Sequence, residues 1–248
     1  MFQKLVLAAA FCATASFATW DKFPVLENHK GEMIVGAEFD KRSEPMVLTP
    51  YVGSRYAVLP NLELGVILPY YVNLSANNEN GLANPVFMAR YQFLPMLNAF
   101  LNVQVPISHD PYNSSEWSFN FGFQYSQNFG IVNLGTELGL TMNTEGDYKE
   151  GAPLRLNFGF ETDFNLGIPL TPFIGADAFV RFGKFHYEGG NFGKCLVGVF
   201  EALPYVGLKY AITPDISVQT SAMVKLGKDD IGLSDTPIVA DFKLKMSF

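Results

Sequence analysis

Apolar and polar residues alternate with a period of two in twelve segments of the chain, which is the pattern of β-strands with two different faces. Most of these segments have nine to thirteen residues, more than the usual five or six and close to the length that crosses a bilayer in a tilted barrel. The alternation therefore predicts an all-β protein with strands of membrane-spanning length. The predicted strands cover residues 32–40, 47–57, 62–72, 83–93, 97–107, 117–127, 131–143, 154–164, 170–182, 200–212, 216–226 and 237–248.

The lengths of the connections also alternate along the chain. Longer polar loops follow the odd-numbered strands, whereas short links follow most even-numbered strands, at residues 59–61, 94–96, 128–130 and 213–215. Outer-membrane barrels have this arrangement, with the short turns on the periplasmic side. The sequence thus predicts a single 12-stranded antiparallel up-and-down transmembrane β-barrel, and the even strand count places both termini in the periplasm.

The charged residues follow the same alternation. All eighteen charged residues of the predicted strands lie on the less apolar face, which faces the lumen in a membrane barrel. A barrel of twelve strands has an intermediate width, so two interpretations remain open: a narrow aqueous channel, or an interior filled by charges that pair with one another. The predicted lumen-lining residues are Glu38, Arg55, Glu63, Arg90, Glu137, Arg155, Glu161, Asp163, Asp177, Arg181, Lys209, Lys225, Asp241, Lys243 and Lys245, together with Glu32, Asp40 and Glu201.

Composition separates a membrane barrel from a water-soluble sandwich or lipocalin-like barrel, in which strands alternate in the same way. Hydrophobic residues make up 48% of the 248 residues and charged residues only 17%, whereas soluble surfaces carry many charges. The polar faces are largely Gly, Asn, Gln and Ser. Large aromatic residues gather near strand ends, where membrane barrels place rings at the headgroups; they include Tyr70, Tyr91, Phe93, Trp117, Tyr125, Phe164, Phe182 and Tyr210.

The first residues have the organisation of a secretory signal. The short basic stretch "MFQK" precedes the apolar run "LVLAAAFCATA", and Ser16 and Ala18 are the small residues that a signal peptidase inspects. The predicted organisation is a signal peptide at 1–18, a periplasmic N-terminal tail or small plug at 19–30, and the barrel at 31–248. Removing the signal takes Lys4 and leaves 16 basic and 24 acidic residues, a net charge of −8, which argues against a nucleic-acid partner.

The last strand resembles the C-terminal signature of bacterial outer-membrane β-barrels, in which an amphipathic strand ends in Phe. The resemblance rests on "DFKLKMSF" and implies that the barrel assembly machinery recognises this strand in a Gram-negative outer membrane, among lipid and lipopolysaccharide. The lipid-facing residues of this assembly signal would be Phe242, Leu244, Met246 and Phe248.

A second resemblance concerns the segments "LELGVILPYY" and "GLANPVFMARYQFLP". They are similar to hairpins of the family of transporter-like barrels that is named after the MetA pathway of phenol degradation. Barrels of that family have a Gly-Leu-Gly-Asp run before a strand that ends Lys-Tyr-x-Phe-Leu. This sequence departs from that pattern at Ala83, Asn84 and Arg90, and it keeps Gly81, Leu82, Tyr91, Phe93 and Leu94.

These features predict a monomeric, porin-like channel for passive passage of small solutes, without catalytic residues, metal or cofactor. One alternative is a non-conducting structural barrel that presents surface loops. Another is a lipid-modifying enzyme, which would need a nucleophile and a base side by side; the histidines His29, His109 and His186 lie in the tail or in loops. The acidic loop residues Glu145, Asp147 and Glu150 do not have the spacing of a calcium loop.

Overall fold

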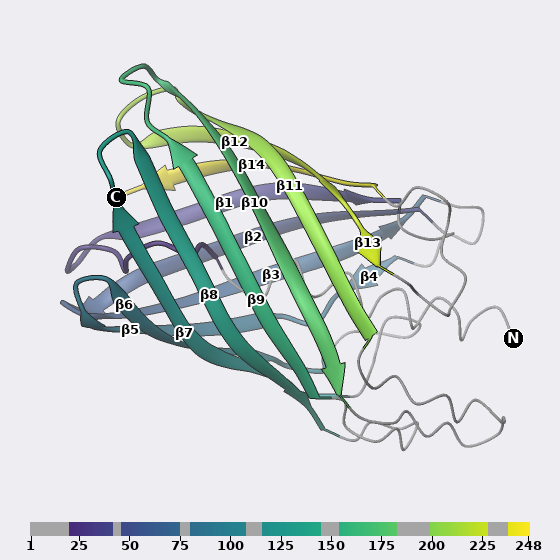
Figure 1. Ribbon diagram of the computed structural model, residues 1–248. Helices are drawn as coiled ribbons and strands as arrows, with labels where there is room; N and C mark the ends of the chain where they lie inside the picture. Colours follow the sequence, from purple (N-terminus) through teal and green to yellow (C-terminus); the bar gives the residue numbers. More distant parts are fainter. Residues whose placement is uncertain are drawn as a thin grey trace, which may run out of the picture.

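The computed structural model describes residues 20–41, 46–74, 80–107, 116–144, 154–182, 199–227 and 238–248, and they form one closed antiparallel β-barrel (Figure 1). Consecutive long strands pair with each other, and β1 pairs with β14 to close the sheet. Two short strands, β4 (Gly81–Leu82) and β13 (Leu226–Gly227), lie beside β3 and β11. The twelve long strands are β1 (Gly31–Asp40), β2 (Val47–Leu59), β3 (Leu62–Asn73), β5 (Val86–Leu94), β6 (Leu97–Gln104), β7 (Ser118–Asn128), β8 (Val132–Asn143), β9 (Leu154–Phe164), β10 (Leu170–Phe182), β11 (Val199–Ala211), β12 (Ile216–Val224) and β14 (Ile238–Ser247).

The predicted 12-stranded antiparallel barrel is therefore confirmed. Among the described residues, no helix is long and apolar enough to cross a membrane. The segment 1–18 lies outside the described residues, so the signal peptide stays a prediction, as does the assignment of either barrel end to the periplasm.

The two faces of the sheet differ as the alternation predicted. In β1, Met33 and Val35 are 44% and 46% exposed, whereas Glu32, Ile34 and Glu38 on the other face are 5% exposed or less. Each of the twelve long strands exposes at least one large apolar side chain outward. A continuous apolar outer surface of this kind is stable in hydrocarbon and not in water.

Proline determines two strand boundaries that the alternation alone misplaced. We expected strands at 83–93 and 97–107, but β5 begins at Val86 and β6 ends at Gln104. Pro85 and Pro106 have no backbone N–H and cannot donate to the ladder. The carbonyl of Pro85 still accepts a hydrogen bond from the Val105 N–H at 3.0 Å, so the two strand ends remain together.

Short turns connect the strands at the end of the barrel where the C-terminus lies (Figure 1). Pro60–Asn61 joins β2 to β3, and Pro95–Met96 joins β5 to β6. The turn between β7 and β8 contains Gly130 at a φ of 83°, which is the left-handed region that favours glycine. We call this end the turn end and the opposite end the loop end.

Aromatic side chains lie against glycines of the neighbouring strand on the inner wall. Gly36 of β1 is the cross-strand partner of Tyr51, and Gly175 of β10 is the partner of Tyr205. A Cβ atom at Gly36 would lie 2.4 Å from the Tyr51 ring, and one at Gly175 would lie 2.3 Å from the Tyr205 ring. Glycine at these positions lets each ring lie close to the wall instead of projecting across the lumen.

Purified protein in detergent is expected to give a β-rich circular dichroism spectrum and to migrate faster on gels before heating than after it. The reason is that closure satisfies the backbone hydrogen bonds of every long strand, so the barrel resists detergent. A helical spectrum, or full solubility without detergent, would contradict the membrane-barrel fold.

Candidate functional site

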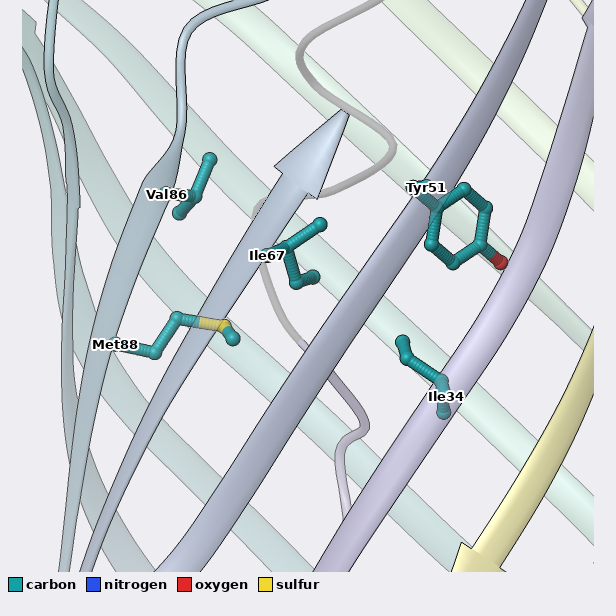
Figure 2. Close-up of a cluster of buried hydrophobic side chains, with 5 residues drawn as sticks. All are labelled: Ile34, Tyr51, Ile67, Val86 and Met88. Carbon is teal, nitrogen blue, oxygen red and sulfur yellow. The ribbon is translucent and has the colours of Figure 1, made fainter. Parts of the chain in front are cut away.

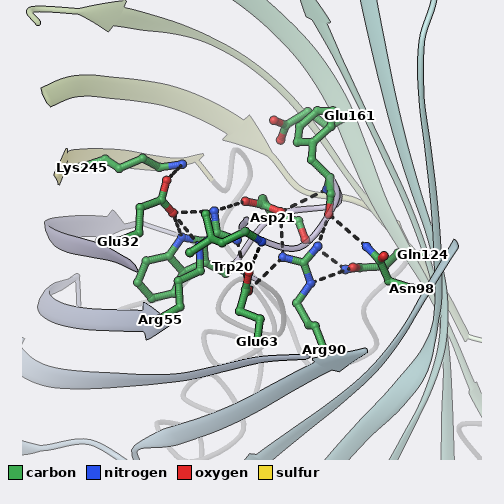
Figure 3. A network of polar contacts seen from close by, with 12 residues as sticks. Trp20, Asp21, Glu32, Arg55, Glu63, Arg90, Asn98, Gln124, Glu161 and Lys245 are labelled. Atoms are coloured by element: carbon green, nitrogen blue, oxygen red, sulfur yellow. Dashed lines mark hydrogen bonds and ion pairs between the residues drawn. The ribbon is translucent and has the colours of Figure 1, made fainter. Parts of the chain in front are cut away.

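The inner wall at the turn end carries a cluster of buried ion pairs around two arginines, which we call the arginine cluster (Figure 3). Arg55 lies 2.5 Å from Glu32 and 3.3 Å from Glu63, and Arg90 lies 3.2 Å from the same Glu63 carboxylate. Lys245 adds a contact of 2.9 Å to Glu32. Register explains the cluster, because Arg55 is the cross-strand partner of Glu32 and Arg90 that of Glu63.

A second cluster, which we call the lysine cluster, occupies the wall formed by β9, β10 and β11. Lys209 lies 2.8 Å from Glu161 and 2.7 Å from Asp163. The hydroxyl of Tyr205 donates a hydrogen bond to Glu161 at 3.0 Å. Asp177 belongs to the same wall, two residues beyond Gly175 in β10.

The other predicted lumen residues lie elsewhere on the inward face. Toward the loop end, Glu201 contacts Lys225 at 3.3 Å and Arg181 at 3.5 Å. The guanidinium of Arg155 lies 4.4 Å from the centre of the Phe179 ring. Closer to the middle, the Tyr51 hydroxyl donates to Asp241 at 2.8 Å, and Lys243 lies 3.7 Å from Asp241. Glu38 is buried, and Glu137 accepts a hydrogen bond from Gln124 at 2.9 Å.

The segment Trp20–Leu26, which precedes β1, lies inside the barrel at the turn end (Figure 3). The Asp21 carboxylate lies 2.8 Å from Arg55 and 3.1 Å from Arg90. The carbonyl of Phe23 accepts hydrogen bonds from Arg90 and, at 3.1 Å, from Asn98. The N–H of Leu26 donates to Glu63 at 2.9 Å. The segment is therefore attached to the arginine cluster through both side-chain and backbone groups.

The next side chain reaches the opposite wall. The Lys22 amine lies 3.0 Å from Asp177 and 3.2 Å from the Tyr205 hydroxyl. The arginines that Asp21 contacts lie in β2 and β5, whereas Asp177 lies in β10 and Tyr205 in β11. Four strands separate β5 from β10 in one direction around the barrel, and three separate β2 from β11 in the other. Successive side chains of an extended segment point opposite ways, so Asp21 and Lys22 together join opposite walls of the lumen.

An apolar patch on the inner wall receives the start of this segment. Ile34, Tyr51, Ile67, Val86 and Met88 come from four strands and form a buried cluster (Figure 2). Trp20 packs against this cluster, and its indole N–H donates to Glu32 at 3.0 Å. The alternation assigned Ile34 to the less apolar face, but it gave no sign that apolar residues of four strands would gather there.

Both charged side chains of the segment keep their charge inside the barrel. Burial by itself would raise the pKa of the Asp21 carboxyl, but the charges of Arg55 and Arg90 outweigh it and hold that pKa well below its usual range. Burial by itself would lower the pKa of the Lys22 amine, but Asp177 and the neighbouring acidic groups raise it instead. The contacts to both walls are therefore ion pairs over a wide range of pH.

A cavity of about 120 Å³ adjoins the segment inside the barrel. Trp20, Asp21 and Lys22 form part of its lining. The rest comes from the apolar patch, from the lysine cluster and from other residues of the inner wall, including those of β12 and β14. Such a volume has room for several water molecules. The side chain of Asn120, which also lines it, is 6% exposed and has an amide nitrogen without a hydrogen-bond partner, as expected where water or a polar solute completes the bonding.

The residues of the predicted assembly signal lie on β14 and at its end. Phe242 and Phe248 are 55% and 59% exposed, so both rings face outward. Phe248 also extends the β1–β14 pairing, because its N–H donates to the Gly31 carbonyl at 2.9 Å and its carbonyl accepts from the Gly31 N–H at 2.8 Å. Leu244 and Met246 share their face of the strand. Recognition by the assembly machinery stays a prediction.

Groups that could support metal binding or catalysis are few in the described part of the chain. It contains no group of three or more His, Cys, Asp or Glu residues that could hold a metal ion. His29 precedes β1, with its ring nitrogen 3.5 Å from the Tyr56 hydroxyl. His109, His186 and the acidic residues at 145–150 lie outside the described residues.

A closed barrel with an apolar outer surface and a polar, ion-paired interior is a transmembrane β-barrel of the outer-membrane type. Within this class, the chain belongs to the family described as "Putative MetA-pathway of phenol degradation", whose model matches residues 30–227. The resemblance of the segments around 62–71 and 81–95 to that family is thereby confirmed. No curated protein matches the chain in sequence.

Several solved outer-membrane channels have the same fold. The COG4313 outer membrane channel from Pseudomonas putida F1 superposes with a TM-score of 0.68 at 10% identity, covering 93% of this chain and 99% of the channel. The NanC porin gives a TM-score of 0.57 at 7% identity, covering 86% of this chain and 98% of the porin. The KdgM porin, solved in complex with disordered oligogalacturonate, gives a TM-score of 0.54 at 9% identity, covering 88% of this chain and 99% of the porin.

Proposed function

We propose that this protein is an outer-membrane channel for small polar solutes, narrowed at its turn end by the segment Trp20–Leu26. The observation that carries the proposal is the cavity inside the closed barrel, because charged and polar side chains line it beside apolar ones and it has room for water. The likeness in fold to the COG4313 outer membrane channel supports the proposal. The KdgM porin, which has the same fold, was solved in complex with oligogalacturonate, and that complex supports a polar solute for this barrel as well.

The orientation forms part of the proposal. With the turn end in the periplasm and residues 1–18 removed as a signal peptide, the segment would enter the lumen from the periplasmic side. Acidic and basic side chains of the inner wall form ion pairs with one another. Such pairs are typical of a charged channel wall, whereas catalysis would need a general acid or base that can exchange its proton with a substrate. We therefore propose no enzymatic activity.

A non-conducting structural barrel is the second candidate, and one observation favours it. The segment joins opposite walls through Asp21 and Lys22, so in this conformation it crosses the lumen at the turn end. The two candidates differ in whether ions pass through the barrel.

Planar-bilayer recording of the purified mature protein is expected to show small, discrete conductance steps in 1 M KCl. Heat-denatured protein from the same preparation is the control, because it removes the barrel but keeps any contaminating detergent. A silent bilayer, with folded protein confirmed by its gel mobility, would favour the structural barrel.

A further inference from the structure

The charges that face the lumen are unequally distributed. At the loop end, Asp40, Glu116 and Glu201 are matched by three basic residues, Arg155, Arg181 and Lys225. In the arginine cluster, the two arginines and Lys245 are likewise matched by three acids, including Asp21. Counted over the described residues, neither region contributes net charge to the lumen.

The remaining part of the lumen is acidic. In the lysine cluster, Lys22 and Lys209 face three carboxylates, those of Glu161, Asp163 and Asp177. Asp241 and Lys243 contribute one charge of each sign, and Glu38 and Glu137 are two further acidic residues in the lining of the cavity. The described lumen therefore has a net negative charge, and the excess lies around the cavity.

We propose that the lumen is selective for small cations over small anions. This inference rests on the proposed channel function and specifies the sign of the charge on the solutes that pass. The cavity has room for water around an ion. The electric field of the charged side chains therefore acts on a hydrated ion, and selection needs no coordination site. The Debye length falls from about 10 Å at 0.1 M salt to about 3 Å at 1 M, so the preference is strongest in dilute salt.

The first test is the reversal potential of the purified mature protein under a KCl gradient. In gradients centred near 0.1 M, we expect potassium to be severalfold more permeant than chloride, and the ratio to fall toward one as both solutions approach 1 M. A preference for chloride, or a ratio near one at low salt, would overturn the inference while leaving the channel function intact. A silent bilayer with folded protein would overturn both.

Two neighbouring residues of β14 provide a matched pair of variants. Asp241 and Lys243 lie on the same face, two positions apart, with their charged groups 3.7 Å from each other. Asp241→Asn is expected to lower the ratio of potassium to chloride permeability, and Lys243→Gln is expected to raise it. A purely structural effect of breaking this contact would move both variants in the same direction, and that result would count against selection by fixed charge.

Discussion

Deleting residues 20–26 from the mature protein is expected to raise its single-channel conductance severalfold. The segment lies inside the barrel and joins opposite walls through Asp21 and Lys22. Its removal widens the lumen at the point where these side chains cross it, and ionic current increases with open cross-section. Planar-bilayer conductance measures the effect. The swelling rate of liposomes in small neutral solutes gives a second measurement, in which the permeating solute carries no charge.

A single substitution tests the same contact in the full chain. Asp21→Asn removes one partner from a buried ion pair, which costs about 3 kcal/mol, so the undocked fraction of the segment should rise about a hundredfold. High-conductance openings should become longer or more frequent. Asp215→Asn is the matched control, because Asp215 lies in the exposed turn before β12. Equal conductance in Asp21→Asn, the deletion and the wild type would show that the segment does not limit the current.

The pH dependence follows from the directions of the two pKa shifts. The docked pKa of Asp21 is depressed, so its contribution is complete above the undocked value near 4 and is lost only as the pH falls below it. The docked pKa of Lys22 is raised, so its contribution is complete below the undocked value near 10.4 and is lost only as the pH rises above it. Acidification from pH 7 to pH 5 should therefore leave the segment docked.

Removal of Phe248 is expected to reduce the assembled protein in the outer membrane to a small fraction of the wild-type level. In the purified barrel, the deletion removes two backbone hydrogen bonds to Gly31, which together contribute about 2 kcal/mol. That loss is small for a closed barrel, so a collapse of membrane levels would reflect failed recognition of the last strand. The measurements are heat-modifiable protein in isolated outer membranes and unfolding of refolded protein by urea.

Ser247→Ala is the control for this prediction, because it changes the adjacent exposed residue and keeps the terminal ring. It should leave membrane levels close to those of the wild type. Normal levels in the Phe248 deletion, or an equal fall in membrane levels and in stability, would remove the assembly-signal interpretation.

Most of the fold could be predicted from the sequence because a single-layer barrel exposes every strand to two different environments. Alternation therefore appears on all twelve strands, and the boundaries of β9 at 154–164 and β10 at 170–182 agree with the expected ones. The exceptions occur where a local rule competes with the pattern. Pro85 and Pro106 end strands that the apolar residues around them would have continued.

The lumen was less predictable, because alternation assigns a residue to a face but not to a partner. The inward face of Arg55 and Arg90 follows from the pattern, whereas their shared contact with Asp21 joins residues 34 and 69 positions apart. The tail itself has no alternation to indicate where it lies. The apolar patch that receives Trp20 was also missed, since each strand contributes only one or two of its residues.

The opposed contacts of Asp21 and Lys22 bear on the order in which the barrel assembles. Asp21 pairs with Arg55 and Arg90, in strands that follow it closely along the chain, whereas Lys22 pairs with Asp177 in the second half. Contacts between residues near in sequence form with less loss of chain entropy. The segment is thus expected to dock first on the early strands and to offer the late strands a charged surface to fold against, so that the barrel closes around a part of its own chain.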